Sequence, residues 1–171
     1  MSKLYVMVGI PNSGKSSFAR QIVKQVPNTI HVSRDEIRFS LVEENEPYFS
    51  KEDLVFDTFV NTIASYLNQG KNAIADATHI NKWSRYNLLE SLEEYFPETE
   101  LIAVFMRTPL DICLDRNETR KGTRTFVPWD TIRKMSRKLS QPRFNENGKI
   151  PFSQIIIVDS DKITRLKNGG E

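Results

Sequence analysis

The chain carries the stretch Gly9-Ile10-Pro11-Asn12-Ser13-Gly14-Lys15-Ser16 directly after the apolar run Leu4–Val8. The residues that follow, 17–23, have the apolar spacing of a helix. Glycines bracket the stretch, and glycine permits backbone angles that turn amide N–H groups toward one point. The order strand, loop, helix therefore predicts a tight turn from a buried strand into the amino terminus of a helix.

This spacing fits the P-loop pattern G-x-x-x-x-G-K-[ST], which binds the phosphates of a nucleotide. The helix dipole adds to the attraction, Lys15 can reach the β- and γ-phosphates, and the Ser16 hydroxyl can bind Mg²⁺. An ordinary glycine-rich turn is the alternative, but the upstream strand and the Lys15-Ser16 pair favour a nucleotide. We expect ATP or another NTP, with Mg²⁺, at a set of eight residues: Gly9, Pro11, Asn12, Ser13, Gly14, Lys15, Ser16 and Ser17.

Composition limits the class of protein. The chain has 171 residues, of which 39% are hydrophobic and 27% charged, as is typical of one globular domain. The net charge of +2 does not by itself indicate a nucleic-acid partner. A single cysteine, Cys113, excludes an internal disulfide and favours a reducing compartment. With no signal-peptide pattern and no apolar run long enough for a membrane span, we expect a cytoplasmic protein with no membrane partner, or one in the host cytoplasm if it is viral.

Short apolar runs alternate with amphipathic segments along the whole chain. Helices are predicted between strands, at 14–26, from 34, at 50–70, 81–96, 109–120 and 128–139, and the strands themselves are predicted at 3–8, 29–33, 73–77, 101–106 and 155–158. Continuous apolar strands indicate a sheet covered on both faces. We therefore predict an α/β fold, a doubly wound parallel sheet of about five strands flanked by helices, of the P-loop NTPase or kinase type, as a single domain over 1–171.

Ligands of such sheets bind at the carboxyl ends of the strands, so the residues there are candidates for the site. After the second strand come Asp35, Glu36 and Arg38. A carboxylate opposite the γ-phosphate can deprotonate an acceptor hydroxyl; Asp35 is the candidate base, with Glu36 as the rival. Asp35 and Arg38 share a helix face, so Arg38 could hold an acceptor phosphate. Helix capping with a local ion pair is almost as good an interpretation.

The third strand ends at Asp76, and Thr78 follows it. A carboxylate that ends a buried strand resembles a Walker-B aspartate, which supports Mg²⁺. It could equally face the acceptor.

Arginines gather after the fourth strand. Arg116 and Arg120 are four residues apart on one helix face, and a glycine loop follows at Gly122. This arrangement predicts an arginine-bearing helical lid at about 109–127, whose Arg116 and Arg120 neutralise phosphate charge. A solvated basic face is the alternative. A second group combines cations with aromatic rings, as single-stranded nucleic acid favours, although a solvated face beside core aromatics is again possible: Arg133, Lys134, Arg137, Lys138 and Arg143 with Phe126, Trp129 and Phe144.

Together these motifs resemble the kinase domain of phage-type 5′-hydroxyl polynucleotide kinases. The resemblance covers residues 3 to about 139 and rests on five elements: Gly9–Ser16, Ser33–Arg38, Asp76–Thr78, Arg116-Asn117-x-x-Arg120 with Gly122-Thr123 and Val127-Pro128, and Ile132-x-x-Met135. The P-loop is shared by many enzymes, whereas the R-D-x-x-R element and the R-x-x-x-R lid together are more selective.

The resemblance implies transfer of the ATP γ-phosphate to the 5′-OH end of DNA or RNA, as in nucleic acid repair. It implies catalytic roles for Asp35 as general base and for Lys15 and Arg120 on the donor phosphates, with Ser16 on the metal. It further implies acceptor binding by five residues: Asp35, Arg38, Asp76, Thr78 and Val127.

The chain also departs from the family pattern. Its lid segment 120–128 is slightly longer. The segment 155–161 superficially resembles the aspartate motif of the phosphatase domain that relatives carry, but Lys162 stands where glycine is expected and only ten residues follow Asp161. We therefore expect no phosphatase domain.

Two other functions stay open. A P-loop kinase for a small acceptor, such as a nucleoside, a sugar or a nucleotide-sugar, would use the same architecture. A nucleotide-binding module without phosphotransfer is the other alternative. A GTPase would need Asn-Lys-x-Asp, and Asn81-Lys82-Trp83-Ser84 lacks the aspartate.

Overall fold

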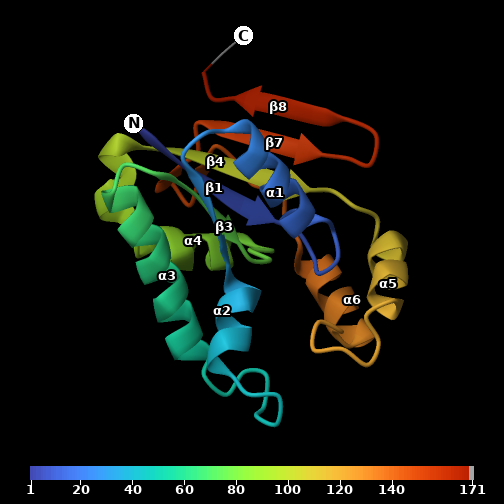
Figure 1. Cartoon of the computed structure of the whole chain (residues 1–171). Helices are drawn as coiled ribbons and strands as arrows, with labels where there is room; N and C mark the ends of the chain where they lie inside the picture. Colours follow the sequence, from blue (N-terminus) through green and yellow to red (C-terminus); the bar gives the residue numbers. More distant parts are fainter. Residues whose placement is uncertain (170–171) are drawn as a thin grey trace.

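The structure, a computed structural model, describes residues 1–169. Its centre is a six-stranded sheet in the order β2-β3-β1-β4-β7-β8 (Figure 1). The strands are β1 Ser2–Val8, β2 Thr29–Ser33, β3 Asn72–Asp76, β4 Thr99–Met106, β7 Gln154–Val158 and β8 Ile163–Lys167, and a separate pair is formed by β5 Asn145–Glu146 and β6 Ile150–Pro151.

Helices connect the strands. They are α1 Lys15–Gln25, α2 Arg34–Leu41, α3 Glu52–Asn68, α4 Lys82–Glu90, α5 Leu110–Glu118 and α6 Trp129–Lys138, with a 3₁₀ helix, η1, at Glu93–Glu98. None of the helices within residues 1–169 is long and apolar enough to cross a bilayer.

Side chains along β1 point alternately to the two faces of the sheet, and helices cover both faces. Tyr5 and Met7 pack with Phe18 and Ile22 of α1 on one face of the sheet. Leu4, Val6 and Val8 point to the other face, into a cluster built with α3 and α4 (Figure 1). Because successive strand residues point to opposite faces, a strand that is apolar throughout is buried between two layers. The doubly wound α/β prediction is confirmed.

The last part of the sheet differs from the prediction. The chain does not end its sheet at 155–158, because β8 pairs antiparallel with β7 and brings the sheet to six strands. The other neighbouring pairs in this sheet are parallel. Strand β8 lies at the edge and carries Arg165 and Lys167, and Ile163 is exposed. A solvated edge strand has no continuous apolar run, so its sequence lacks the signal that marks the inner strands.

Two predicted helices also differ in detail. The helix predicted at 81–96 ends as α4 at Glu90, Leu92 turns into the core, and η1 contains Pro97. The helix predicted at 50–70 begins as α3 at Glu52, and its N-cap, Lys51, makes no side-chain capping bond. The buried face of α3 contains Val55 and Phe59, while Leu54 is exposed.

Candidate active site

A close approach at Gly9 and a left-handed backbone at Gly14 explain why the P-loop has glycine at these two positions. The N–H of Gly9 donates to the carbonyl of Thr78 at 2.9 Å, and a Cβ on Gly9 would lie 2.5 Å from Ser13 Oγ and 3.1 Å from Met106 Cβ, so a larger residue would force these side chains to shift. Gly14 has φ +95° and Asn12 has φ +66°, in the left-handed region that glycine and asparagine tolerate best. The loop therefore holds a tight turn that these residue types tolerate.

The amino terminus of α1 has no side-chain cap. Gly14 caps α1 without a side-chain bond, and the first turn contains no acidic residue. Ser13 Oγ is buried and has no hydrogen-bond partner within residues 1–169. Free N–H groups, a helix amino terminus and an unpartnered hydroxyl fit the oxygens of a bound phosphate.

Lys15 lies inside this loop. Its side chain is buried, and Nζ donates to the carbonyl of Ile10 at 2.8 Å. Burial lowers the pKa of Lys15, and the charges of Asp76 and Asp35 offset part of this effect. A cation that is poorly solvated is stabilised strongly by an arriving polyphosphate.

Ser16 and the end of β3 form an oxygen pair. Ser16 Oγ donates to Asp76 Oδ2 at 2.7 Å, and His31 Nε2 lies 2.7 Å from the same oxygen. Burial raises the pKa of Asp76, but the bonds from His31 and Ser16 and the charge of Lys15 outweigh it, so the pKa is lowered. The carboxylate is therefore ionised. The sequence did not single out His31, which is near Asp76 only because β2 and β3 pair in register.

The hydroxyl and the carboxylate suit Mg²⁺, which keeps most of its ligands as water and phosphate. Within residues 1–169 no group of three or more His, Cys, Asp and Glu side chains forms a protein-only metal site. The donor set thus fits a metal bound together with a nucleotide.

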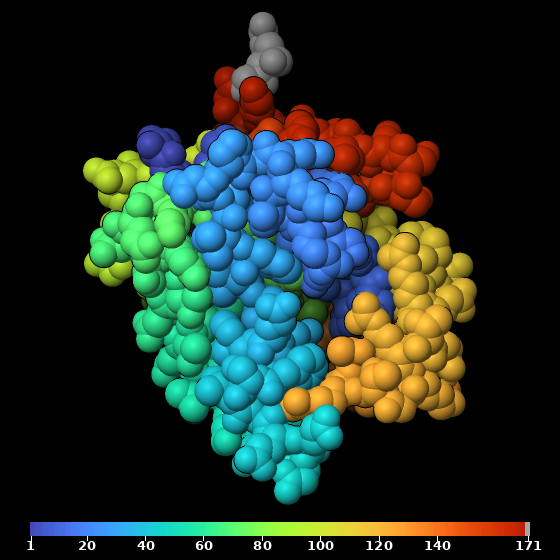
Figure 2. All heavy atoms as spheres, in the orientation of Figure 1, coloured from blue at the N-terminus to red at the C-terminus, as the bar shows by residue number. Residues whose placement is uncertain are grey.

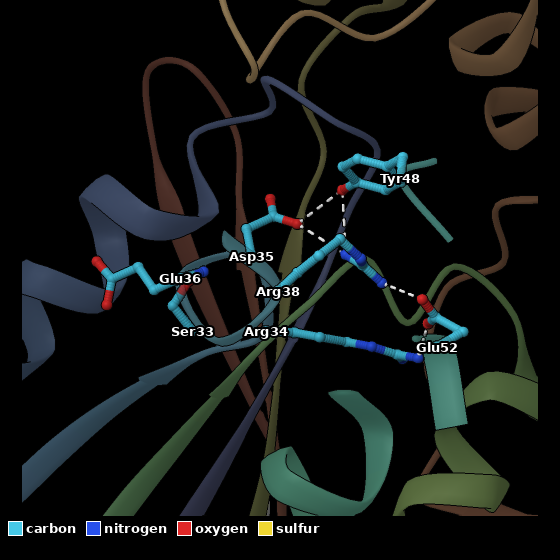
Figure 3. A network of polar contacts seen from close by, with 7 residues as sticks. All are labelled: Ser33, Arg34, Asp35, Glu36, Arg38, Tyr48 and Glu52. Atoms are coloured by element: carbon cyan, nitrogen blue, oxygen red, sulfur yellow. Dashed lines mark hydrogen bonds and ion pairs between the residues drawn. The ribbon is translucent and has the colours of Figure 1, made fainter. Parts of the chain in front are cut away.

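A polar network starts at the first turn of α2 (Figure 3). Ser33 caps α2, and its Oγ accepts from the N–H of Glu36 at 3.3 Å. Asp35 Oδ1 accepts from Arg38 Nη1 at 3.2 Å and from the Tyr48 hydroxyl at 3.0 Å. The side chain of Glu36 points away from this network, which distinguishes Asp35 from its rival (Figure 3).

Glu52, at the start of α3, completes the network. It accepts from Arg38 Nη2 at 2.5 Å and also from Arg34. Burial alone would lower the pKa of Arg38, but the bond to Glu52 and the surrounding charges raise it above its ordinary value. Sequence reasoning found Asp35 and Arg38 but missed Glu52 and Tyr48, because neither lies within one helical turn of them.

The lid is joined to the P-loop through α5. Arg116 Nη1 donates to the carbonyl of Asn12 at 3.1 Å. Asn117, fully buried, accepts from Asn12 Nδ2 at 3.1 Å and from the N–H of Val127 at 3.1 Å. Arg120 is exposed, yet its charge contributes to lowering the pKa of Lys15. The sequence motif included Asn117 without assigning it a role; in the structure it ties both ends of the lid loop to the P-loop.

The lid also reaches across to α2. Arg124 Nη2 donates to the carbonyl of Val42 at 2.5 Å, and its guanidinium lies 4.6 Å from the centroid of the Phe39 ring. Figure 2 shows the lid segment meeting the segment after α2, with a hollow above this contact that faces the P-loop. The two halves of the candidate site therefore enclose one opening.

The remaining predicted site residues are the cations of α6 with Arg143, the aromatic residues beside them, and the pair Thr78 and Val127. The cations of α6 are exposed, as the nucleic-acid interpretation requires, and so is Arg143. Trp129 is also exposed, with Phe126 at 6.3 Å between ring centroids. Phe144 is instead half-buried and packs against the core. The carbonyls of Thr78 and Val127 are occupied within the chain, by Gly9 and Asn117.

Comparisons with known proteins agree with the P-loop kinase fold. A family model described as an AAA domain (AAA_33) matches residues 4–142. The L-seryl-tRNA(Sec) kinase of Methanococcus maripaludis is 27% identical over 143 residues, which are 81% of this chain and 53% of that protein.

Two solved structures have similar folds. A chain in the Pnkp1/Rnl/Hen1 RNA repair complex superposes with a TM-score of 0.71 at 26% identity, over 81% of this chain and 44% of that chain. Kti12 of Chaetomium thermophilum, in complex with ADP-AlF3, superposes with a TM-score of 0.65 at 16% identity, over 92% of this chain and 89% of that chain. This chain spans about half the length of the seryl-tRNA kinase and of the RNA repair protein.

Proposed function

Because the chain belongs to the AAA domain family and has the P-loop kinase fold, we propose that it transfers the γ-phosphate of ATP to the 5′-hydroxyl end of DNA or RNA. One observation carries this proposal: Asp35 is fixed beside Arg38 at the carboxyl end of β2, on the sheet edge that also bears the P-loop. A base and a phosphate-binding cation thus stand where an acceptor would approach the donor.

In the donor half, the P-loop amides, Lys15 and Ser13 bind the β- and γ-phosphates, and Arg116 and Arg120 cover them from the lid. These cations stabilise charge on the transferred group, and the lid excludes water that would otherwise hydrolyse ATP. Mg²⁺, held beside Ser16 and Asp76, supplies further charge neutralisation when bound.

In the acceptor half, Asp35 takes the proton of the 5′-hydroxyl as its oxygen attacks phosphorus. The new O–P bond forms, the bond to the β-phosphate oxygen breaks, and ADP leaves. Only one oxygen of Asp35, Oδ1, is used by Arg38 and Tyr48, so Oδ2 is open to the hydroxyl. Arg38 binds the first phosphate of the strand.

Two of the comparisons support a nucleic-acid acceptor. One relative is a kinase named for tRNA, and one structural neighbour belongs to an RNA repair complex. The exposed cations of α6 would contact further phosphates of the strand.

The test is an acceptor panel with γ-labelled ATP: 5′-OH DNA and RNA, single- and double-stranded, beside nucleosides and sugars. We expect label on the 5′-OH strands. Asp35→Asn should lower transfer by about 10²- to 10⁴-fold while ATP binding persists, because a general base contributes that factor. Glu36→Gln is the matched control and should retain activity. Label on a sugar but on no strand would overturn the proposal.

A further inference from the structure

Two aromatic rings beside the acceptor half have no part in the mechanism above. Tyr48 and Phe49 lie in the loop between α2 and α3, with 41% and 64% of their surfaces exposed. Their ring centroids are 4.7 Å apart and their planes 87° apart. A phenylalanine ring left largely in water forgoes the free energy that its burial against another surface would release.

These rings are held at the candidate base. The Tyr48 hydroxyl donates to Asp35 and accepts from Arg38 Nη1 at 3.0 Å. The Arg38 guanidinium lies 4.4 Å from the Tyr48 centroid and 5.5 Å from that of Phe49. Two direct contacts therefore join Phe49 to the carboxylate that would receive the reacting hydroxyl.

The lid crosses the opening next to these two rings. Phe39, which receives Arg124 of the lid, lies 6.5 Å from Tyr48 between ring centroids. The buried Arg38, which is paired with Glu52, thus lies on the α2 side of the aromatic pair, and the exposed Arg124 lies on the lid side. Exposed rings between guanidinium groups match single-stranded nucleic acid, in which bases offer flat π-faces and phosphates carry the charge.

We propose that Phe49, braced by Tyr48, is a stacking platform for an unpaired nucleobase near the 5′ end of the acceptor strand. The inference rests on the proposed function and adds to it a preference for a single-stranded end. Arg38 and Arg124 bind the phosphates on either side of the stacked base. Because every base has a π-face, the platform selects for the presence of a base and not for its identity.

The experiment compares two single-stranded 5′-OH DNA oligonucleotides in steady-state transfer from labelled ATP. One has ordinary bases, and in the other the first three nucleotides are abasic. With the wild-type protein we expect a KM about 5- to 150-fold higher for the abasic strand, since stacking on one aromatic ring contributes about 1–3 kcal/mol. Phe49→Ala should bring the ratio of the two KM values close to one, and Phe49→Trp should restore it.

A second readout does not need turnover. The fluorescence of Phe49→Trp, measured against that of the wild-type protein, should be quenched by the strand with bases and not by the abasic strand. Leu166→Ala, an exposed apolar residue on β8, is the control and should keep the wild-type KM ratio. Circular dichroism verifies that each variant is folded.

The outcomes separate the two proposals. Transfer to 5′-OH strands with a KM ratio that Phe49→Ala leaves intact would overturn the platform alone. An equal KM for both strands in the wild-type protein would do the same. Transfer to no strand, with label on a small acceptor, would overturn the proposed function and the platform with it.

Discussion

His79 is a buried titratable side chain close to the site. It has φ +41°, is 3% exposed, and its Nδ1 lies 2.8 Å from the carbonyl of Met7. A carbonyl only accepts, so Nδ1 carries the proton of the neutral ring. Burial lowers the pKa of His79 to about 4. The folded protein therefore keeps this imidazole uncharged at neutral pH.

This burial predicts a pH dependence of stability. Unfolded histidine has a pKa of about 6.5, so between this value and about 4 the unfolded state binds a proton that the folded state does not. Stability should therefore fall by up to about 3 kcal/mol as pH drops from 7 to 4, as urea denaturation would measure. The lowered pKa of Asp76 acts below about pH 3.9, outside this window.

His79→Asn tests whether His79 causes this pH dependence of stability. Asparagine tolerates the left-handed backbone and keeps a donor for Met7, so the variant should fold and its stability should lose most of this slope. An unchanged slope would show that other groups cause the acid sensitivity.

Glu52 is the positioning residue of the network in Figure 3. Glu52→Gln removes the negative charge between Arg34 and Arg38, so Arg38 should lose its fixed orientation. We expect a higher acceptor KM with ATP binding unchanged, and a loss of about 1–2 kcal/mol in unfolding free energy, since charge-assisted bonds at half-buried sites are worth about this much. Asp53→Asn, an exposed neighbour in the same helical turn, is the control. Equal effects of both variants would contradict the role.

At the scale of elements, hydrogen bonds at its base and at its far side restrain the lid. Asn117 secures its base, and Arg124 is the link from its far side to α2. Arg124→Ala should make amide hydrogen exchange across 119–128 about 5-fold faster, because losing about 1 kcal/mol of contacts raises the open population by that factor. Arg133→Ala, which removes an exposed cation of α6, should leave this exchange unchanged. Unaltered exchange in Arg124→Ala would show that the contact does not restrain the lid.

At the scale of the molecule, one buried ion pair ties the segment after α6 to α4. Arg85 is fully buried and donates to Glu146 at 2.7 and 2.5 Å, and to the carbonyls of His79 and Ser140 at 2.9 and 3.2 Å. Four separate segments therefore meet at one guanidinium. Buried charge is tolerated here because its donors are paired.

Glu146→Gln should be strongly destabilising. Removing one partner leaves an uncompensated buried cation, at a cost of about 3–5 kcal/mol, so Tm should fall by about 6–20 °C in calorimetry. The double variant Arg85→Met with Glu146→Leu should recover part of this loss, since it leaves no unpaired charge. A Tm within about 2 °C of wild type for Glu146→Gln would contradict the analysis of the pair.

Local patterns in the sequence determined the inner strands, the P-loop and the boundary between β2 and α2. Each of these depends on residues within a few positions of one another: an apolar run, two glycines, or Ser33 capping its own helix. Asp35 and Arg38 could be found for the same reason, because they share one helical turn. The edge strand β8 and the break after α4 were missed, since solvent and core contacts decide them.

Tertiary structure alone decided the partners of the candidate site. Glu52 and Tyr48 reach Arg38 and Asp35 through the return of the chain from α2 into α3, and His31 reaches Asp76 through strand pairing. No periodicity in sequence encodes such contacts, because packing of separate elements selects them. The sequence therefore determines that a nucleotide loop faces a carboxylate and an arginine, while the fold decides which residues hold that pair in place.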